Sequence, residues 1–164
     1  MATHALKEKR RKEGAEAERC VRRILSQLSQ VEFAVFNDVR AKYGNIDHLV
    51  VSRTGAVFLI ETKSHRGKIT LGEEAIFING TTPEGDFIGQ ITRNIQWLRE
   101  KINKKVGVNP WIVAILVFPN AAVGRPRILK RVNVIGKQSL VPLILRYPPR
   151  SPQRQVWNNR DIFE

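Results

Sequence analysis

The chain has 164 residues, 42% of them hydrophobic, and a formal net charge of +13 at pH 7. This length is sufficient for one domain with a sizeable core, and the absence of any apolar run of about 18 residues predicts no transmembrane helix. Cys20 is the single cysteine, which excludes an internal disulfide and a cysteine-rich zinc site. Residues 1–18 contain no apolar segment of the kind that a signal peptide needs, so a cytoplasmic location is expected.

The positive charge is distributed unevenly along the sequence. Residues 101–160 contain many Lys and Arg and no Asp or Glu, whereas the two signs nearly balance in residues 1–100. Basic surfaces bind the phosphates of nucleic acids, because each neutralised phosphate releases counterions. The charge therefore favours a nucleic-acid partner over a solvated basic surface. An anionic membrane surface is a weaker alternative, because the sequence contains no evident strongly amphipathic basic helix.

Hydrophobic periodicity predicts the first elements in chain order. Residues 1–12 are expected to be a flexible basic arm. Helices are expected from about Gly14 to Gln30 and from about Phe87 to Lys105, each with apolar residues at helical spacing. The strands expected between these helices are residues 31–39, 46–52, 56–63, 67–71 and 75–79.

The second half of the chain predicts fewer regular elements. Residues 111–118 are apolar throughout and predict a strand buried on both faces, and residues 131–136 predict a short strand. Residues 137–147 are ambiguous, with a short helix broken at Pro142. Residues 148–164 are expected to form a loosely packed tail. Together, the elements predict one α/β domain over residues 13–147, with a mixed β-sheet flanked by helices.

The strands 46–52 and 56–63 are expected to form a hairpin. Gly55 ends a three-residue link, a position where hairpin loops often need a left-handed residue. In that register Val51 opposes Val57, and Asp47 opposes Glu61, so that the two carboxyl side chains are neighbours. Two acids therefore meet at one end of an otherwise apolar hairpin.

Neighbouring carboxylates repel each other, and a divalent cation relieves that repulsion. Oxygen ligands without His or Cys suit Mg²⁺ or Mn²⁺, with waters completing the coordination. Lys63 lies two residues beyond Glu61 and projects from the same face of the strand, where it would orient or deprotonate an attacking water. The alternative is an ion pair between Glu61 and Lys63 in solvent. The opposed Asp47, the buried strand and the basic chain favour a site.

The motifs around these residues resemble a known family. An Asp at the start of one strand and Glu-x-Lys at the end of the next resemble the PD-(D/E)xK nuclease superfamily. More narrowly, the segments EGAEAE, FNDV, GNIDHLVVS, GAVFLIETKSHRGKI and GQITRN resemble, in this order, the nuclease-related domain family (NERD) between Gly14 and Phe118. The resemblance implies a restriction-endonuclease-like fold with an αβββαβ core. It also implies hydrolysis of DNA phosphodiester bonds with Mg²⁺ or Mn²⁺, and RNA stays open as a substrate.

The resemblance also implies a role for each matched residue. Asp47 and Glu61 would bind the metal together with the carbonyl of Thr62. The first-helix acid falls at Glu18 by resemblance, whereas helical geometry alone leaves Glu16 and Glu18 open. The catalytic residues implied are Glu18, Asp47, Glu61, Lys63 and Gln90.

Four further residues are expected to contact the nucleic acid. Arg66 and Lys68 follow Lys63 along the chain, and Arg93 and Asn94 follow Gln90 on the second helix. For Gln90 and Asn94 an exposed polar face is the alternative. A non-catalytic nucleic-acid-binding module with a degenerate site is the competing function, and a homodimer is expected if paired sites cut both strands of a duplex.

Overall fold

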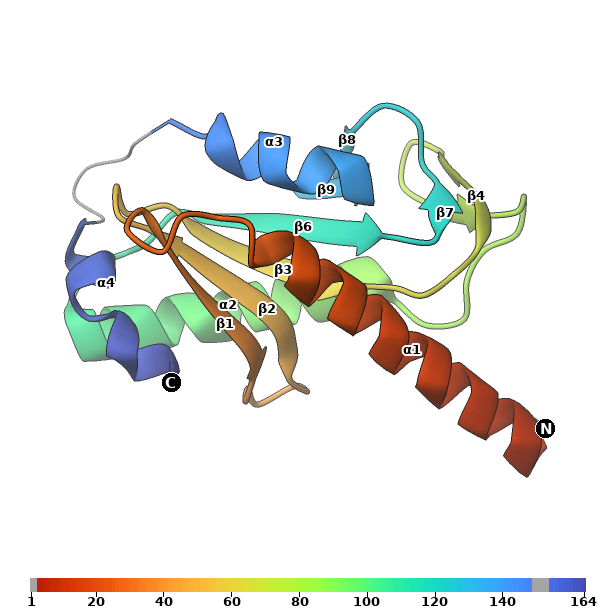
Figure 1. Ribbon diagram of the computed structural model, residues 1–164, viewed down its shortest axis with the longest axis horizontal. Helices are drawn as coiled ribbons and strands as arrows, with labels where there is room; N and C mark the ends of the chain where they lie inside the picture. Colours follow the sequence, from red (N-terminus) through yellow and green to blue (C-terminus); the bar gives the residue numbers. More distant parts are fainter. Residues whose placement is uncertain (1–2, 149–153) are drawn as a thin grey trace.

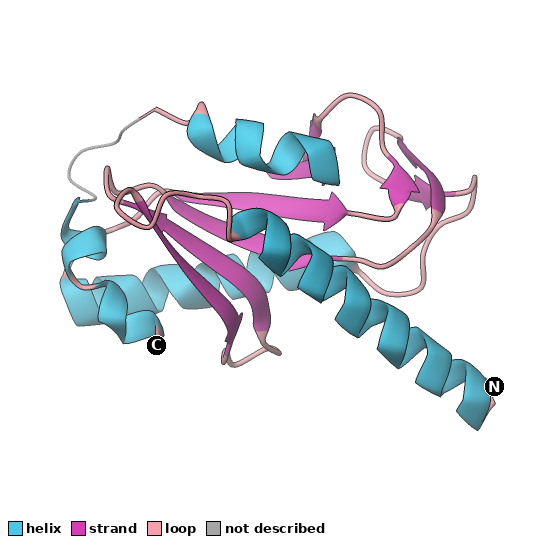
Figure 2. Cartoon of the chain, in the orientation of Figure 1, coloured by secondary structure: helices cyan, strands magenta, loops and turns pink. Residues whose placement is uncertain are grey.

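The computed structural model describes residues 3–148 and 154–164, and its centre is a six-stranded mixed sheet with helices on both faces (Figures 1 and 2). The helical elements are α1 (His4–Leu25), α2 (Phe87–Val106), η1 (Lys137–Ser139), α3 (Leu140–Leu145), α4 (Arg154–Asn158) and η2 (Arg160–Phe163). The strands are β1 (Phe33–Val39), β2 (Ile46–Ser52), β3 (Val57–Thr62), β4 (Gly67–Leu71), β5 (Ile76–Ile78), β6 (Ile112–Phe118), β7 (Ala121–Ala122), β8 (Arg127–Leu129) and β9 (Val132–Gly136). None of the helices in the described residues is long and apolar enough to cross a membrane.

The large sheet has the order β1-β2-β3-β6-β9-β8, and β5-β4-β7 form a small second sheet. Strands β1, β2 and β3 are antiparallel neighbours, whereas β3 and β9 both run parallel to β6. The core elements α1, β1, β2, β3, α2 and β6 follow the αβββαβ order, with β4 and β5 inserted before α2. The expected restriction-endonuclease-like α/β fold is therefore confirmed.

Strand β3 is buried along its whole length, because helices cover both faces of the sheet. Its side chains alternate between the two faces, as in any strand. Val57 and Leu59 pack into the cluster that contains the apolar face of α2. Phe58 and Ile60 pack into the cluster that contains the buried residues of α1 and α3. This double burial explains why β3 and β6 are continuous apolar runs and not alternating sequences.

The hairpin of β2 and β3 has the register that its turn predicts. Val51 pairs with Val57, and the left-handed backbone that the turn requires occurs at Gly55, with φ of 96°. The ladder of paired residues extends to His48 and Ile60 and ends there. Asp47 and the end of β3 therefore lie just beyond the last pair.

The start of the chain differs from the prediction. Residues 4–12, expected to be a flexible arm, form the first turns of α1, and the helix ends at Leu25, five residues before the expected end. The hydroxyl of Thr3 caps this helix by accepting a hydrogen bond of 3.2 Å from the amide of Leu6. Lys, Arg, Glu, Leu and Ala are strong helix formers, so the composition that suggested an arm also favours a helix.

The end of the chain also differs from the prediction. Of the expected loose tail, residues 149–153 lie outside the described residues, but residues 154–164 pack against the core. Val156 and Phe163 are 0% and 5% exposed, and the ring of Phe163 meets that of Phe36 edge-on, with 5.7 Å between centroids. Trp157 and Ile162 also pack against the same core cluster, so apolar side chains hold the segment on the core.

Pro142 does not break a helix. It lies in the first turn of α3, where the missing N–H has no intrahelical partner to lose. The short strands β7 and β8 were not predicted, because the polar segments around them show no recognisable alternation of apolar residues.

Replacing Phe163 with Ala tests the packing of the chain end. Phe163→Ala should lower the free energy of unfolding by about 3–5 kcal/mol, because it leaves a cavity in the core. Leu145→Ala is the control, since Leu145 is 60% exposed and its loss should change stability by no more than about 0.5 kcal/mol. Denaturant unfolding of both variants measures the difference, and similar stabilities would contradict the packing described.

Candidate functional site

A group of charged side chains lies at the end of β3, where this strand leaves the core. Asp47 comes from the start of β2, Glu61 and Lys63 from the end of β3, and Glu18 from α1, which packs across β3 (Figure 1). The β-hairpin and one helix thus bring together four of the five residues for which the resemblance implies a catalytic role. The register of the hairpin places Asp47 next to the end of β3. The charges of Asp47 and Lys63 act on the pKa values of both Glu18 and Glu61, which agrees with a common site.

Asp47 connects the two strands beyond the end of their ladder. Its Oδ2 accepts a hydrogen bond of 2.8 Å from the backbone amide of Thr62. Asp47 is partly buried and Thr62 is 7% exposed. The bond fixes the Asp47 carboxylate beside the backbone of β3, and it places Thr62 at the site.

Glu61 is the most unfavourably placed acid of the group. It is only 4% exposed, and its Oε1 has no hydrogen-bond partner among the described residues. Burial, followed by the negative charge of Asp47, raises the pKa of Glu61 to about 9, although the charge of Lys63 opposes the shift. Without a cation, this carboxyl group therefore keeps its proton at neutral pH.

Glu18 experiences the same surroundings to a smaller extent. Glu18 is exposed by its accessible surface, but partial desolvation and then the charges of Asp47 and Asp38 raise its pKa to about 7. The structure thus places Glu18 beside Asp47.

Asp38 is an acid of this group that the sequence did not single out. It has a left-handed backbone with φ of 55°, which is uncommon for a residue other than glycine. The side chain of Asn45 donates a hydrogen bond of 2.9 Å to its Oδ1. The available signal was the Asn-Asp pair that interrupts an otherwise apolar strand in the segment FNDV.

Lys63 is held in place by its backbone and by an aromatic ring. Its amide donates a hydrogen bond of 3.0 Å to the carbonyl of Val117, and its Nζ lies 4.4 Å from the centre of the Phe87 ring. Such a cation–π contact stabilises an ammonium group in one position. Phe87, the first residue of α2, was predicted only as part of that helix.

His65 packs beside the same aromatic residue. Its ring centroid lies 5.6 Å from that of Phe87 and 6.2 Å from that of Phe118. Burial lowers the pKa of His65, and the positive charges of Lys63 and Arg10 lower it further. Arg10 belongs to the first half of α1, so the positive charge of this part of the helix acts on the surroundings of the site.

The residues predicted on α2 occupy different environments. Gln90 is half-buried, and a Cβ built on Gly44 would lie 3.7 Å from its Nε2, so Gln90 lies against the turn that precedes Asp47. Arg93 is exposed. Asn94 is 0% exposed, and neither atom of its amide group has a partner among the described residues. The exposed polar face considered for Asn94 is therefore wrong for this structure, because the helix turns that position into the core, whereas its contact with nucleic acid stays a prediction.

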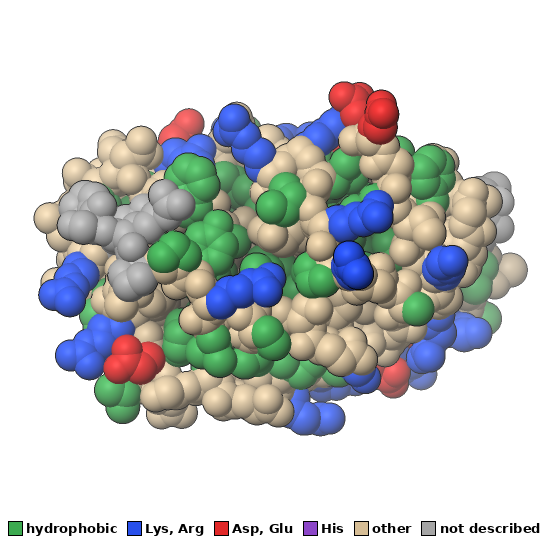
Figure 3. Space-filling model, turned by 90° about the horizontal axis from the view of Figure 1, so that it is seen from above, with side chains coloured by type: hydrophobic (Ala, Val, Ile, Leu, Met, Phe, Trp, Pro, Cys, Tyr) green, Lys and Arg blue, Asp and Glu red, His purple; other side chains and the backbone are tan. Residues whose placement is uncertain are grey.

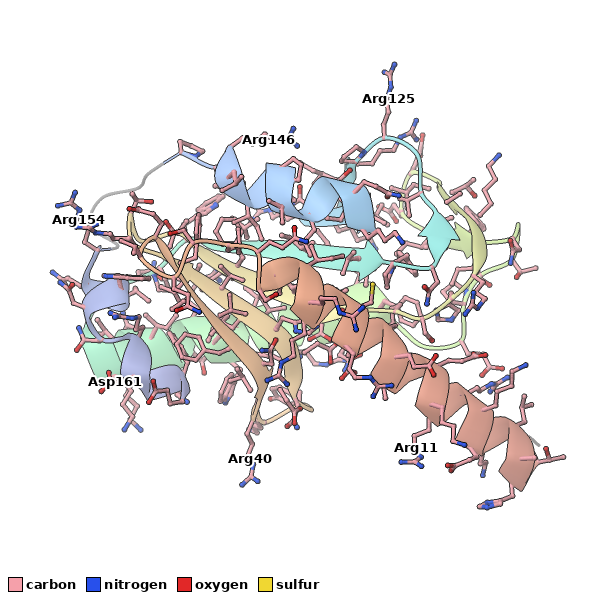
Figure 4. All side chains as sticks on the ribbon, in the orientation of Figure 1. Arg11, Arg40, Arg125, Arg146, Arg154 and Asp161 are labelled. Atoms are coloured by element: carbon pink, nitrogen blue, oxygen red, sulfur yellow. The ribbon has the colours of Figure 1, made fainter. Side chains whose placement is uncertain are left out.

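The predicted basic residues after Lys63 are exposed on and near β4. The carbonyl of Arg66 accepts a hydrogen bond of 3.2 Å from the side chain of Asn79. Lys68 lines a groove of about 830 Å³ together with Arg125 and Arg127, and Arg125 projects outward from the connection between β7 and β8 (Figure 4). The floor of this groove includes Ile69, Leu71 and Val123.

The face on the α3 side of the molecule is also basic. Figure 3 shows Lys and Arg side chains spread over it, whereas the acidic side chains in view lie near its margin. This distribution agrees with the acid-free sequence of residues 101–160.

The acids at the end of β3 fit a hard divalent cation. Within residues 3–148 and 154–164, no group of three or more His, Cys, Asp or Glu side chains is placed so that it could hold a metal ion by itself. However, the donor set of Asp47, Glu61 and Glu18 consists of carboxylate oxygens, and Mg²⁺ typically takes one or two carboxylates plus waters. A cation would also give the unpartnered oxygen of Glu61 a ligand bond.

Comparison with models of protein families identifies the family of the chain. Residues 13–119 match the Nuclease-related domain (NERD). The chain belongs to the nuclease-related domain family. The match confirms the resemblance seen in the motifs, and it includes Glu18, Asp47, Glu61, Lys63 and Gln90.

Other comparisons add little to this result. No curated protein sequence matches the chain. Among solved structures it is similar to the "crystal structure of a repair endonuclease from Pyrococcus abyssi", with 12% sequence identity and a TM-score of 0.33. That alignment covers 85% of this chain and 47% of the other, so this NERD protein spans less than half the length of that chain.

The raised carboxyl pKa values predict that the metal-free protein loses stability as pH rises. The pKa of Glu61 is raised from an ordinary 4.5 to about 9. The folded state therefore binds a proton that the unfolded state has released, and this group's contribution is lost as pH rises from about 4.5 to about 9. Glu61 alone should lower the free energy of unfolding by at most about 1.4 kcal/mol per pH unit.

Thermal unfolding in EDTA between about pH 6 and pH 9 measures this effect. Glu61→Gln should flatten the dependence, and the exposed Glu84→Gln should leave it unchanged. A native protein whose melting temperature is independent of pH in EDTA would show that Glu61 is not held as described.

Proposed function

We propose that this NERD protein is a metal-dependent nuclease that hydrolyses DNA phosphodiester bonds with Mg²⁺ or Mn²⁺. The observation that carries the proposal is the grouping of Glu18, Asp47 and Glu61 beside Lys63, at the end of a buried strand. Membership of the nuclease-related domain family supports the class of activity. The acids support its dependence on a metal, since the charge of Lys63 only partly offsets their mutual repulsion and the pKa values of Glu18 and Glu61 stay raised.

Asp47 and Glu61 would hold the ion, with the backbone of Thr62 next to them and Glu18 on the side of α1. When bound, the ion would polarise the phosphate and lower the pKa of a coordinated water. Glu61 would then be ionised, since a positive charge beside it favours the carboxylate. The hydrogen bond from Thr62 to Asp47, 2.8 Å long, would keep one carboxylate oriented during the reaction.

Lys63 would act on the attacking water or on the charge that develops on the phosphate. A fixed ammonium group stabilises such charge better than a mobile one, because it needs no reorganisation. The ring of Phe87 supplies that fixation. Gln90 lies on α2, against the turn that precedes Asp47. It would hold a water or a phosphate oxygen.

The substrate would be bound through its phosphates by basic residues around the site. Lys68, Arg125 and Arg127 line the groove at β4, and Arg66 and Arg93 are exposed. DNA is proposed over RNA on the family resemblance alone. Cutting both strands of a duplex would need two sites and therefore a homodimer, and the single cysteine agrees with a cytoplasmic location.

The second candidate is a binding module that holds nucleic acid without cutting it. One observation favours it: the residues that line the groove at β4 include none of the predicted catalytic residues. Nucleic acid could therefore be bound there without the acids.

Cleavage of supercoiled, linear and single-stranded DNA, and of RNA, with Mg²⁺, Mn²⁺ or EDTA tests the proposed activity. Lys63→Ala and Asp47→Asn should each reduce the rate at least about 100-fold, because each removes a group acting on the transition state. Lys104→Ala, on the exposed last turn of α2, is the matched control and should cut normally. Binding without cutting under either metal would support the second candidate instead.

A separate variant tests the role of the aromatic ring. Phe87→Leu keeps an apolar side chain at the start of α2 but removes the ring face that holds Lys63. The cleavage rate should fall by about 10- to 100-fold with little change in DNA affinity, since a small misplacement of a catalytic group is costly. Phe77→Leu, a substitution on β5 outside the site, is the control. Equal rates for the two variants would show that the cation–π contact does not position Lys63.

A further inference from the structure

The first turns of α1 extend beyond the rest of the molecule. All of α1 is described, and its buried residues begin only at Ala17. Figure 1 shows this N-terminal part projecting away from the sheet. We call residues 4–12 the α1 overhang. They also precede residues 13–119, which match the family.

The side chains of the overhang are predominantly basic and exposed. Its cations are Lys7, Lys9, Arg10, Arg11 and Lys12. The one acid, Glu8, is bound to Arg11 with 2.6 Å between the charged atoms, and Figure 4 shows Arg11 projecting from the helix. The overhang therefore presents a largely uncompensated positive charge.

This charge is unfavourable for the helix itself. Lys7 and Arg10 are three residues apart, and so are Lys9 and Lys12, so like charges lie next to each other on the helix surface and repel. A helical segment without burial is also marginal in water. Anions that bind along the overhang would remove the repulsion and stabilise these turns.

The overhang has a fixed position relative to the candidate site. The same helix continues to Glu18, beside Asp47, and the charge of Arg10 acts on His65, two residues after Lys63. With a rise of about 1.5 Å per residue, Arg11 lies about 10 Å and Lys7 about 16 Å along the axis from Glu18. Figure 1 also shows the overhang and the small sheet β5-β4-β7 at the same end of the molecule.

We infer that the α1 overhang is a clamp for the phosphate backbone of the nucleic acid that is cut at the end of β3. This inference rests on the proposed function and adds to it where the substrate runs. Phosphates of one strand advance about 3.4 Å per nucleotide along a duplex axis. A helix that follows that axis would contact phosphates about three to five nucleotides from the bond that is cut. Binding would also order the overhang.

Two triple variants with the same loss of charge test the clamp. In the overhang variant, Lys7→Gln, Lys9→Gln and Lys12→Gln remove three cations but leave Arg10 and the Glu8–Arg11 pair intact. In the control variant, three exposed cations at the end of α2 and just after α3 are neutralised, and the substitutions are Lys104→Gln, Lys105→Gln and Arg146→Gln. Gln keeps helix propensity in both sets.

The first measurement is affinity for a DNA duplex in EDTA, so that binding is observed without cleavage, over a range of salt concentrations. The logarithm of affinity falls against the logarithm of salt by about 0.9 for each phosphate contact on duplex DNA. In the overhang variant, the magnitude of that slope should be smaller by about two to three. This variant should also bind DNA at least about 10-fold more weakly at physiological salt. The control variant should keep the slope of the native protein.

The second measurement is hydrogen exchange of the amides in residues 4–12, with and without the duplex. Protection should rise on binding in the native protein and much less in the overhang variant. A structural role of the overhang alone would not make its protection depend on DNA.

Several results would overturn the clamp. A slope unchanged in the overhang variant would do so, as would equal losses in both variants, which would reflect net charge alone. If the overhang variant bound vesicles containing phosphatidylserine more weakly than the native protein but kept the native salt dependence of DNA binding, the overhang would be assigned to a membrane surface. Failure of the native protein to bind any nucleic acid would defeat the proposed function as well, whereas the other results leave it intact.

Discussion

Strand β3 is hydrogen-bonded to a neighbour on each side and covered by helices on both faces, and this constraint fixes the charged groups at its end. A strand in that position cannot slide, because a shift of one residue would turn every apolar side chain to the opposite face. The register with β2 therefore determines that Asp47 lies beside the end of β3. The bond from the Thr62 amide to Asp47 extends that order past the last paired residues, and α1 and α2 then add Glu18 and Phe87 from either side.

The same arrangement concentrates unfavourable electrostatic energy at one point. A buried carboxyl without a partner, next to a second acid, is costly wherever it occurs, and the apolar packing of the rest of the sheet offsets that cost. Such perturbed groups gather at functional sites in many proteins. Here the acids and the fixed ammonium group also lie within the residues that match the family.

Much of the fold and the centre of the site could be predicted from the sequence, because both depend on local patterns. Apolar periodicity located the main helices and strands, and Gly55 set the register that brings Asp47 to the end of β3. The predictions that failed were those that depended on tertiary context. The environment of Asn94 was missed because a polar residue can face the core when the helix packing requires it. Phe87 and Asp38 were not assigned to the site, since neither a helix-starting aromatic nor a strand-ending acid indicates what will pack beside it.

The β2–β3 hairpin has a consequence for the order in which the molecule folds. Its contacts are local in sequence, whereas the parallel pairings of β6 with β3 and β9 close long loops, one of them containing all of α2. Local pairings form at lower entropic cost, so the hairpin can form before the rest of the sheet. Asp47 and Glu61 would then be brought together while water still surrounds them, where their repulsion is weak. Desolvation of the acids would be deferred until the helices close over the sheet, which makes the final docking of α1 and α2 the step most sensitive to cations.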